Sequence, residues 1–144
     1  MQPWKIQALL AALFAGLTSV LAKAGMKNLG PDLSLALRTC VIFTLVLGNA
    51  LLLTGGRPLA ALRETTPRDL ALLALSGVTA ALSWIFYFRA MQSGTVSLVA
   101  LVDKGSILVT LLLSFWLLHE PFTPKIALGS TLILAGIGVL TWKT

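Results

Sequence analysis

The composition of the chain argues against a water-soluble fold. It has 144 residues, of which 57% are hydrophobic and 11% charged, and its mean hydropathy is +0.92. Soluble domains carry roughly a quarter charged residues, so the apolar side chains here need lipid as their solvent. The net charge of +6 does not indicate nucleic acid, because the basic residues lie mostly at the edges of apolar runs, where membrane-surface cations belong. The single cysteine, Cys40, excludes an internal disulfide.

Five apolar segments are long enough to cross a bilayer, which takes about 20 residues in a helix. We expect helices over residues 5–24, 35–55, 69–92, 96–118 and 125–142, in one domain spanning 1–144. The polar segment 57–69 is expected to contain a short interfacial helix. A cleaved signal peptide is the weaker interpretation of the N-terminus, because the apolar run is long and Lys23 would stand inside the cleavage box. The sequence therefore predicts an all-α membrane protein, a bundle of five transmembrane helices with its termini on opposite sides.

The fourth segment carries an acid and a base inside the apolar stretch. Asp103 and Lys104 lie about a third of the way along it, where either residue costs roughly 2.5–3.5 kcal/mol to insert. Adjacent helical residues point about 100° apart, so the two side chains are not expected to stack on each other. Four polar residues share one helix face: Asp103, Ser106, Thr110 and Ser114. We predict that this region binds a substrate or an ion, and interhelical hydrogen bonding is the alternative for the hydroxyl residues.

The end of the third segment is a second candidate. Trp84 and Tyr87 lie there beside Arg89. Aromatic rings next to a cation are suited to lining a ligand cavity. The equal alternative is an aromatic belt at the membrane interface, with Arg89 extending to the headgroups.

Basic residues near the first turn between segments are a third candidate. Lys23 and Lys27 lie one turn apart, and Arg38 is expected on the same side of the membrane. Three interpretations are open: the residues form a cluster that binds an anionic group, one of them pairs with Asp103, or their side chains extend to the lipid headgroups.

No catalytic or metal-binding pattern accompanies these residues. One histidine and one cysteine do not make a metal site, and neither a phosphate-binding glycine loop nor a nucleophile elbow is present. We therefore expect no enzymatic activity, no metal, no cofactor and no nucleic-acid partner.

Two stretches of the sequence resemble a known family. One comprises Ser83-Trp84-Ile85-Phe86-Tyr87-Phe88-Arg89-Ala90-Met91, Gly94 and Val102-Asp103-Lys104-Gly105-Ser106; the other comprises Leu117-Leu118-His119-Glu120-Pro121-Phe122-Thr123, Gly129 and Gly136. They resemble the five-helix branch of the EamA-like drug/metabolite transporters, and the resemblance covers essentially the whole chain. Lys23 and Arg38 also fall where such domains often carry a lysine and an arginine.

The resemblance implies one half of a ten-helix transporter built from two inverted five-helix halves. It implies secondary transport of small metabolites or drugs across a bacterial inner membrane, by a dimer, with the solute itself unidentified. A non-transporting membrane subunit and a component of a lipid-carrier flippase are the alternatives. One departure concerns Leu101, which stands where relatives often have a proline. The missing proline disfavours a broken fourth helix, although Gly105 restores some backbone freedom.

The balance of charge favours an antiparallel homodimer. Five basic residues are expected on each side of the membrane, with Lys104 inside, so the chain has little bias in orientation. An inverted pair would place a binding site at its interface near the bilayer midplane. If Lys23, Arg38 and Arg89 instead lie within the membrane, five basic residues remain on the side of the N-terminus and two on the opposite side. The N-terminus would then be cytoplasmic, and a parallel dimer or a different partner protein would follow.

Overall fold

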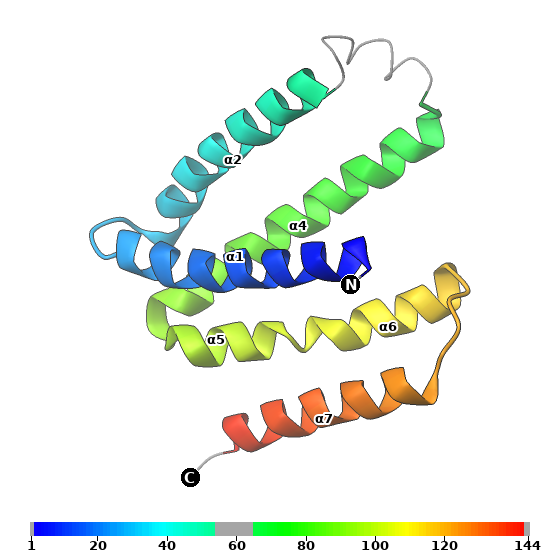
Figure 1. Cartoon of the computed structure of the whole chain (residues 1–144). Coiled ribbons are helices and arrows are strands. Elements are labelled where there is room, and N and C mark those ends of the chain that lie inside the picture. The colour runs from blue at the N-terminus through cyan, green and yellow to red at the C-terminus, as the bar shows by residue number, and fades with distance from the viewer. Residues whose placement is uncertain (1, 54–64, 143–144) are drawn as a thin grey trace. The chain divides into compact units, whose positions relative to one another are not determined.

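The computed structural model describes residues 2–53 and 65–142 (Figure 1). Its described helices are α1 (Pro3–Gly25), α2 (Pro31–Leu53), α4 (Pro67–Ser93), α5 (Val96–Asp103), α6 (Ser106–Leu117) and α7 (Pro124–Thr141). With α5 and α6 taken together, five stretches are long and apolar enough to cross a membrane. This confirms the all-α, five-span prediction. Residues 54–64, which include the end of the helix predicted over 35–55 and most of the segment 57–69 with its expected interfacial helix, lie outside the described part of the chain; within residues 65–69, α4 begins at Pro67.

Local sequence determines where four of the described helices begin. Each starts at a proline: Pro3, Pro31, Pro67 and Pro124. A proline suits the first helical position because the missing N–H would have no partner within the helix. Two of these helices are also capped by a threonine. The Asp69 N–H donates to Thr66 Oγ1 at 3.2 Å before α4, and the Ile126 N–H donates to Thr123 Oγ1 at 3.3 Å before α7.

The fourth predicted helix is interrupted between α5 and α6. The N–H groups of Lys104 and Gly105 donate to the carbonyls of Leu101 and Val102, three residues back, at 3.1 and 2.9 Å. This is the tighter 3-10 pattern, which often marks a hinge or strain inside a helix. The missing proline at position 101 was expected to disfavour a break, and the interruption is limited to this one turn, in which Lys104 and Gly105 keep right-handed helical dihedral angles. Gly105 permits the turn, because a Cβ there would lie 3.0 Å from the Val102 carbonyl oxygen.

The chain forms two compact units, residues 1–92 and residues 93–144. In the first unit the buried side chains come from helix ends, namely from the end of α1, the first turns of α2 and the last turns of α4: Met26, Leu35, Phe88 and Met91. In the second unit α7 lies along α5 (Figure 1). None of the described residues of this unit is buried. Exposed apolar side chains cover both units, as helices in lipid require. The single-domain prediction stays a prediction.

Candidate functional site

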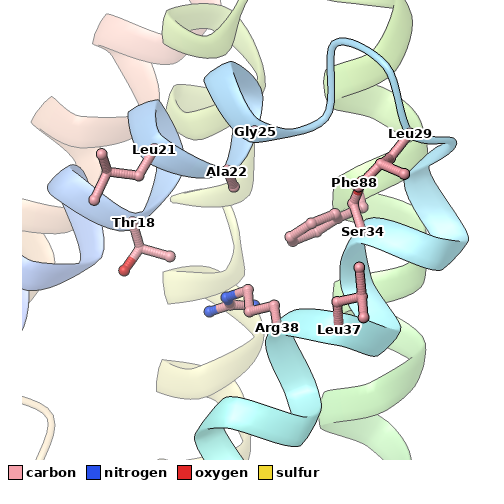
Figure 2. Close-up of a pocket in the computed structure, with 9 residues that line it drawn as sticks. All are labelled: Thr18, Leu21, Ala22, Gly25, Leu29, Ser34, Leu37, Arg38 and Phe88. Carbon is pink, nitrogen blue, oxygen red and sulfur yellow. The ribbon is translucent and has the colours of Figure 1, made fainter.

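A cavity of about 360 Å³ lies within the first unit, among α1, α2 and α4. Its polar lining residues are Thr18 from α1 and Ser34 and Arg38 from α2, and the Phe88 ring comes from α4. The rest of the lining is small or apolar: Leu21, Ala22, Gly25, Leu29 and Leu37. Figure 2 shows the Arg38 guanidinium directed into the space between α1 and α2, on the side of Thr18. Apolar walls with a few convergent polar groups are typical of sites for small molecules.

Two aromatic rings hold the Arg38 guanidinium. Its Cζ lies 4.9 Å from the centroid of the Trp84 ring and 5.5 Å from that of Phe88. The side chain is half-buried. The sequence predicted an aromatic and cationic cavity around Trp84, but it named Arg89 as the cation. The structure places Arg38 there instead.

Ser34 is a polar residue of this cavity that sequence analysis missed. Its Oγ is buried and has no hydrogen-bond partner among the described residues. Ser34 precedes Arg38 by four positions, so both side chains lie on one face of α2. That spacing within an apolar helix was the available signal.

Tyr87 and Lys23 connect α1 to α4 and do not line this cavity. Tyr87 Oη and Ser19 Oγ are hydrogen-bonded at 2.9 Å. Lys23 Nζ donates to the Met91 carbonyl oxygen, and to the Gln92 carbonyl oxygen at 3.3 Å. Carbonyls in the last turn of a helix lack partners within the helix and favour a cation beside them. Lys23 therefore stabilises the end of α4.

The expected cluster of three cations does not form around Arg38. Lys23 and Lys27 line a different cavity of about 470 Å³ in the first unit, together with Gln92. Only Arg38 of the three lines the cavity with Ser34.

Arg89 has an acidic partner that the sequence did not reveal. Its Nε lies 3.1 Å from Asp32 Oδ1, and its Nη2 lies 3.3 Å from Asp32 Oδ2. Asp32 stands in the first turn of α2, where a carboxylate is also favoured by the helix dipole. Both side chains are exposed. The pair ties the start of α2 to the last turns of α4.

In the second unit a groove of about 570 Å³ lies between α6 and α7. Three of the predicted residues line it: Lys104, Ser106 and Thr110. The Thr110 hydroxyl donates to the Ser106 carbonyl oxygen at 3.1 Å, so part of its hydrogen-bonding capacity is used within its own helix. Apolar residues of α7 form the opposite wall: Leu132, Ile133, Ile137 and Leu140.

Asp103 is not among the residues that line this groove. Its Oδ2 lies 3.9 Å from Lys104 Nζ, and the two side chains are 40% and 62% exposed. The two charged ends therefore approach each other although the side chains leave the helix in different directions. The length and flexibility of the Lys104 side chain account for this approach, since a 3-10 turn separates adjacent residues by about 120°.

Together the five apolar spans and the cavities with polar lining are those of a multi-pass membrane protein. The model of the EamA-like transporter family matches residues 2–142, and the chain belongs to that family. It is 36% identical over 137 residues to the "Uncharacterized transporter in cobO 3'region" of Sinorhizobium sp, an alignment covering 94% of each chain. It is 31% identical over 107 residues to the "Uncharacterized transporter YvbV" of Bacillus subtilis (strain 168), covering 72% of this chain and 35% of that one. No solved structure matches the chain.

Proposed function

We propose that the chain is a secondary transporter of small metabolites or drugs in a bacterial inner membrane, working as a dimer. The interruption of the fourth span at Lys104 and Gly105 is the observation that carries this proposal. Irregular backbone at membrane depth is tolerated only where it is covered by protein or lines a water-filled cavity. Discontinuous helices also build the substrate and ion sites of secondary transporters. The eight residues of α5 place the break roughly 12 Å from the start of the span.

The exposure of the charged pair supports a dimer. Asp103 and Lys104 belong to a membrane-spanning segment, yet within the second unit both side chains are substantially exposed. Such charges need a polar partner or water rather than lipid. A second copy covering this face would provide a polar interior for them.

Flux by the purified protein tests the function. A thermal-shift screen first identifies a metabolite that raises the unfolding temperature, since a ligand bound only to the folded state stabilises it. That metabolite is then supplied to proteoliposomes under a pH gradient. We expect uptake by the chain alone. A ligand that binds without being moved would favour the non-transporting subunit, and flux restricted to lipid-linked compounds would favour the flippase component.

Asp103 is the proposed proton carrier, because it is an acid within a membrane span and beside the interruption. We predict that Asp103→Asn reduces gradient-driven flux to the level of protein-free liposomes. Glu120→Gln is the matched control, because it removes one carboxylate outside the helices and should leave flux unchanged. An Asp103→Asn protein that folds and retains gradient-driven flux would rule out this role.

A further inference from the structure

We propose that the cavity of the first unit binds the anionic group of a small organic anion that has an apolar body, through the Arg38 guanidinium and the Ser34 hydroxyl. The inference rests on the proposed function in that it names the class of solute. It is tested by equilibrium binding, so that it stands or fails separately from transport.

The charge of Arg38 is the first support. A guanidinium keeps its charge in proteins, and this one is half-buried within a span. The ion pairs found within residues 2–53 and 65–142 join Arg89 to Asp32 and Lys104 to Asp103, and neither involves Arg38. The faces of Trp84 and Phe88 attract the cation but do not neutralise it. Its planar set of donors matches two oxygens of a carboxylate or phosphate.

The hydroxyl of Ser34 is the second support and is independent of charge. Within the described part of the chain it is buried without a hydrogen-bond partner. Buried polar groups are nearly always satisfied, and the exceptions call for an explanation. Ser34 and Arg38 line the same cavity one helical turn apart. The cavity therefore offers a ligand two donors from the same face of α2.

The walls of the cavity determine the rest of the ligand. Leu21, Leu37 and Phe88 are apolar, and the volume of about 360 Å³ is near the lower end of the range for small-molecule pockets. A cationic or neutral ligand would leave Arg38 without a counter-charge. A small anion with an apolar body satisfies both the cation and the walls. The anionic headgroup of a lipid presents the same chemistry, so the experiment includes both sources.

The binding test uses Trp84 as the reporter, because the guanidinium stacks on its ring. The other three tryptophans are replaced by phenylalanine: Trp4, Trp116 and Trp142. The protein in phosphatidylcholine nanodiscs is titrated with 4-phenylbutyrate and with the uncharged 4-phenylbutyramide. We expect the carboxylate to change Trp84 fluorescence and to bind roughly tenfold or more tightly than the amide. Arg38→Gln should abolish that preference, whereas Arg68→Gln, which removes a cation outside the cavity, should keep it.

Ser34→Ala separates ligand binding from a structural role. We expect affinity for 4-phenylbutyrate to fall roughly 2- to 10-fold, as for loss of one hydrogen bond. The unliganded protein should unfold at the same or a higher temperature, because the variant removes a buried hydroxyl that had no partner. A purely structural hydroxyl would give the opposite pattern, with lower stability and unchanged affinity. Should Arg38→Gln not fold, Arg38→Lys replaces it; because lysine keeps the charge and loses the planar set of donors, we expect the preference for the carboxylate to be reduced rather than abolished.

Nanodiscs containing phosphatidylglycerol distinguish the two sources of the anion. If the apparent affinity for the carboxylate is lower in these discs, a lipid headgroup is the competing ligand. If the affinity is unchanged, the ligand is a soluble solute. Either result supports the inference when it depends on Arg38. Equal binding of acid and amide, or equal behaviour of the Arg38→Gln and Arg68→Gln proteins, would overturn it. Binding without flux would count against the transporter alone, and flux without dependence on Arg38 would count against the anion site alone.

Discussion

At position 105 the side chain is a single hydrogen atom, and the Val102 carbonyl oxygen lies 3.0 Å from where a Cβ would be. That approach accompanies the two 3-10 hydrogen bonds of Lys104 and Gly105. Any larger residue would have to push the carbonyl away or restore the regular helix. In the sequence the neighbouring charges of Asp103 and Lys104 are the more conspicuous feature. The local backbone, however, depends on the glycine.

We predict that Gly105→Ala favours a continuous fourth helix and lowers the flux of the identified ligand. Alanine is more favourable in a helix than glycine by about 1 kcal/mol, and its Cβ crowds the Val102 carbonyl oxygen. Amide hydrogen exchange should slow around Lys104, and uptake into proteoliposomes should fall. Gly77→Ala is the control, because nothing beyond the neighbouring backbone of its own helix lies within 4 Å of a Cβ there. Equal flux from both variants and the parent protein would show that the interruption is not needed.

At the scale of the helices, much of the polar content is satisfied locally. Hydroxyls donate to carbonyls four residues back in their own helices at Thr39, Thr44, Ser130 and Thr131. In lipid this arrangement removes the penalty for a hydroxyl without needing a partner on another helix. A stripe of hydroxyls in the sequence is therefore weak grounds for a site. Ser34 differs because its hydroxyl has no such bond among the described residues.

Helix positions were predictable and the partners of charged residues were not. Apolar length is a local signal and located the five spans, whereas the proline at the start of four helices is an equally local signal that the sequence prediction did not use. Arg89 and Asp32 are 57 positions apart, and no local pattern connects them. The same holds for Arg38 with Trp84, which are brought together by packing between α2 and α4. The sequence thus named Arg38 as a candidate without indicating its surroundings.

The start of α4 provides a test of helix capping. Thr66 Oγ1 accepts from the Asp69 N–H and donates to Asp69 Oδ2 at 2.7 Å. We predict that Thr66→Ala lowers the free energy of unfolding by about 1 kcal/mol, the usual effect of losing an N-cap. Thr66→Ser retains the hydroxyl and should have little effect. The comparison is made by thermal unfolding in one detergent, and equal stability of the two variants would contradict the assigned cap.

At the scale of the whole molecule, little apolar surface is buried within either of the two units. Four of the described apolar residues are buried, and all belong to the first unit. Large side chains elsewhere, such as Leu52 and Val139, are mostly exposed. Lipid or another protein surface must cover them, because exposure of so much apolar surface to water is unfavourable. The dimer predicted from the charges therefore has ample surface available, and its orientation is the property to measure.

Accessibility of single cysteines tests the antiparallel arrangement. In a Cys40→Ala background, Thr65→Cys marks the segment before α4 and Asn28→Cys marks the segment between α1 and α2. An impermeant maleimide is applied to sealed vesicles of both orientations. For an antiparallel homodimer we expect each site to be labelled from both sides, since balanced charge permits both insertions. If each site is labelled from one side only, and the two sites from opposite sides, the antiparallel homodimer is excluded. A parallel dimer or a different partner protein would then be the remaining interpretation.

The contacts between α1 and α4 also have a consequence for biosynthesis. Ser19 meets Tyr87, and Lys23 meets the Met91 carbonyl, across 68 positions of the chain. At about 5–20 residues per second, α1 emerges from the ribosome roughly 3–14 s before its partners exist. During that interval we expect the Lys23 ammonium to remain near the headgroups, so α1 reaches its final depth only after α4 has been inserted. The first helix to be synthesised is therefore among the last to reach its final position in the membrane.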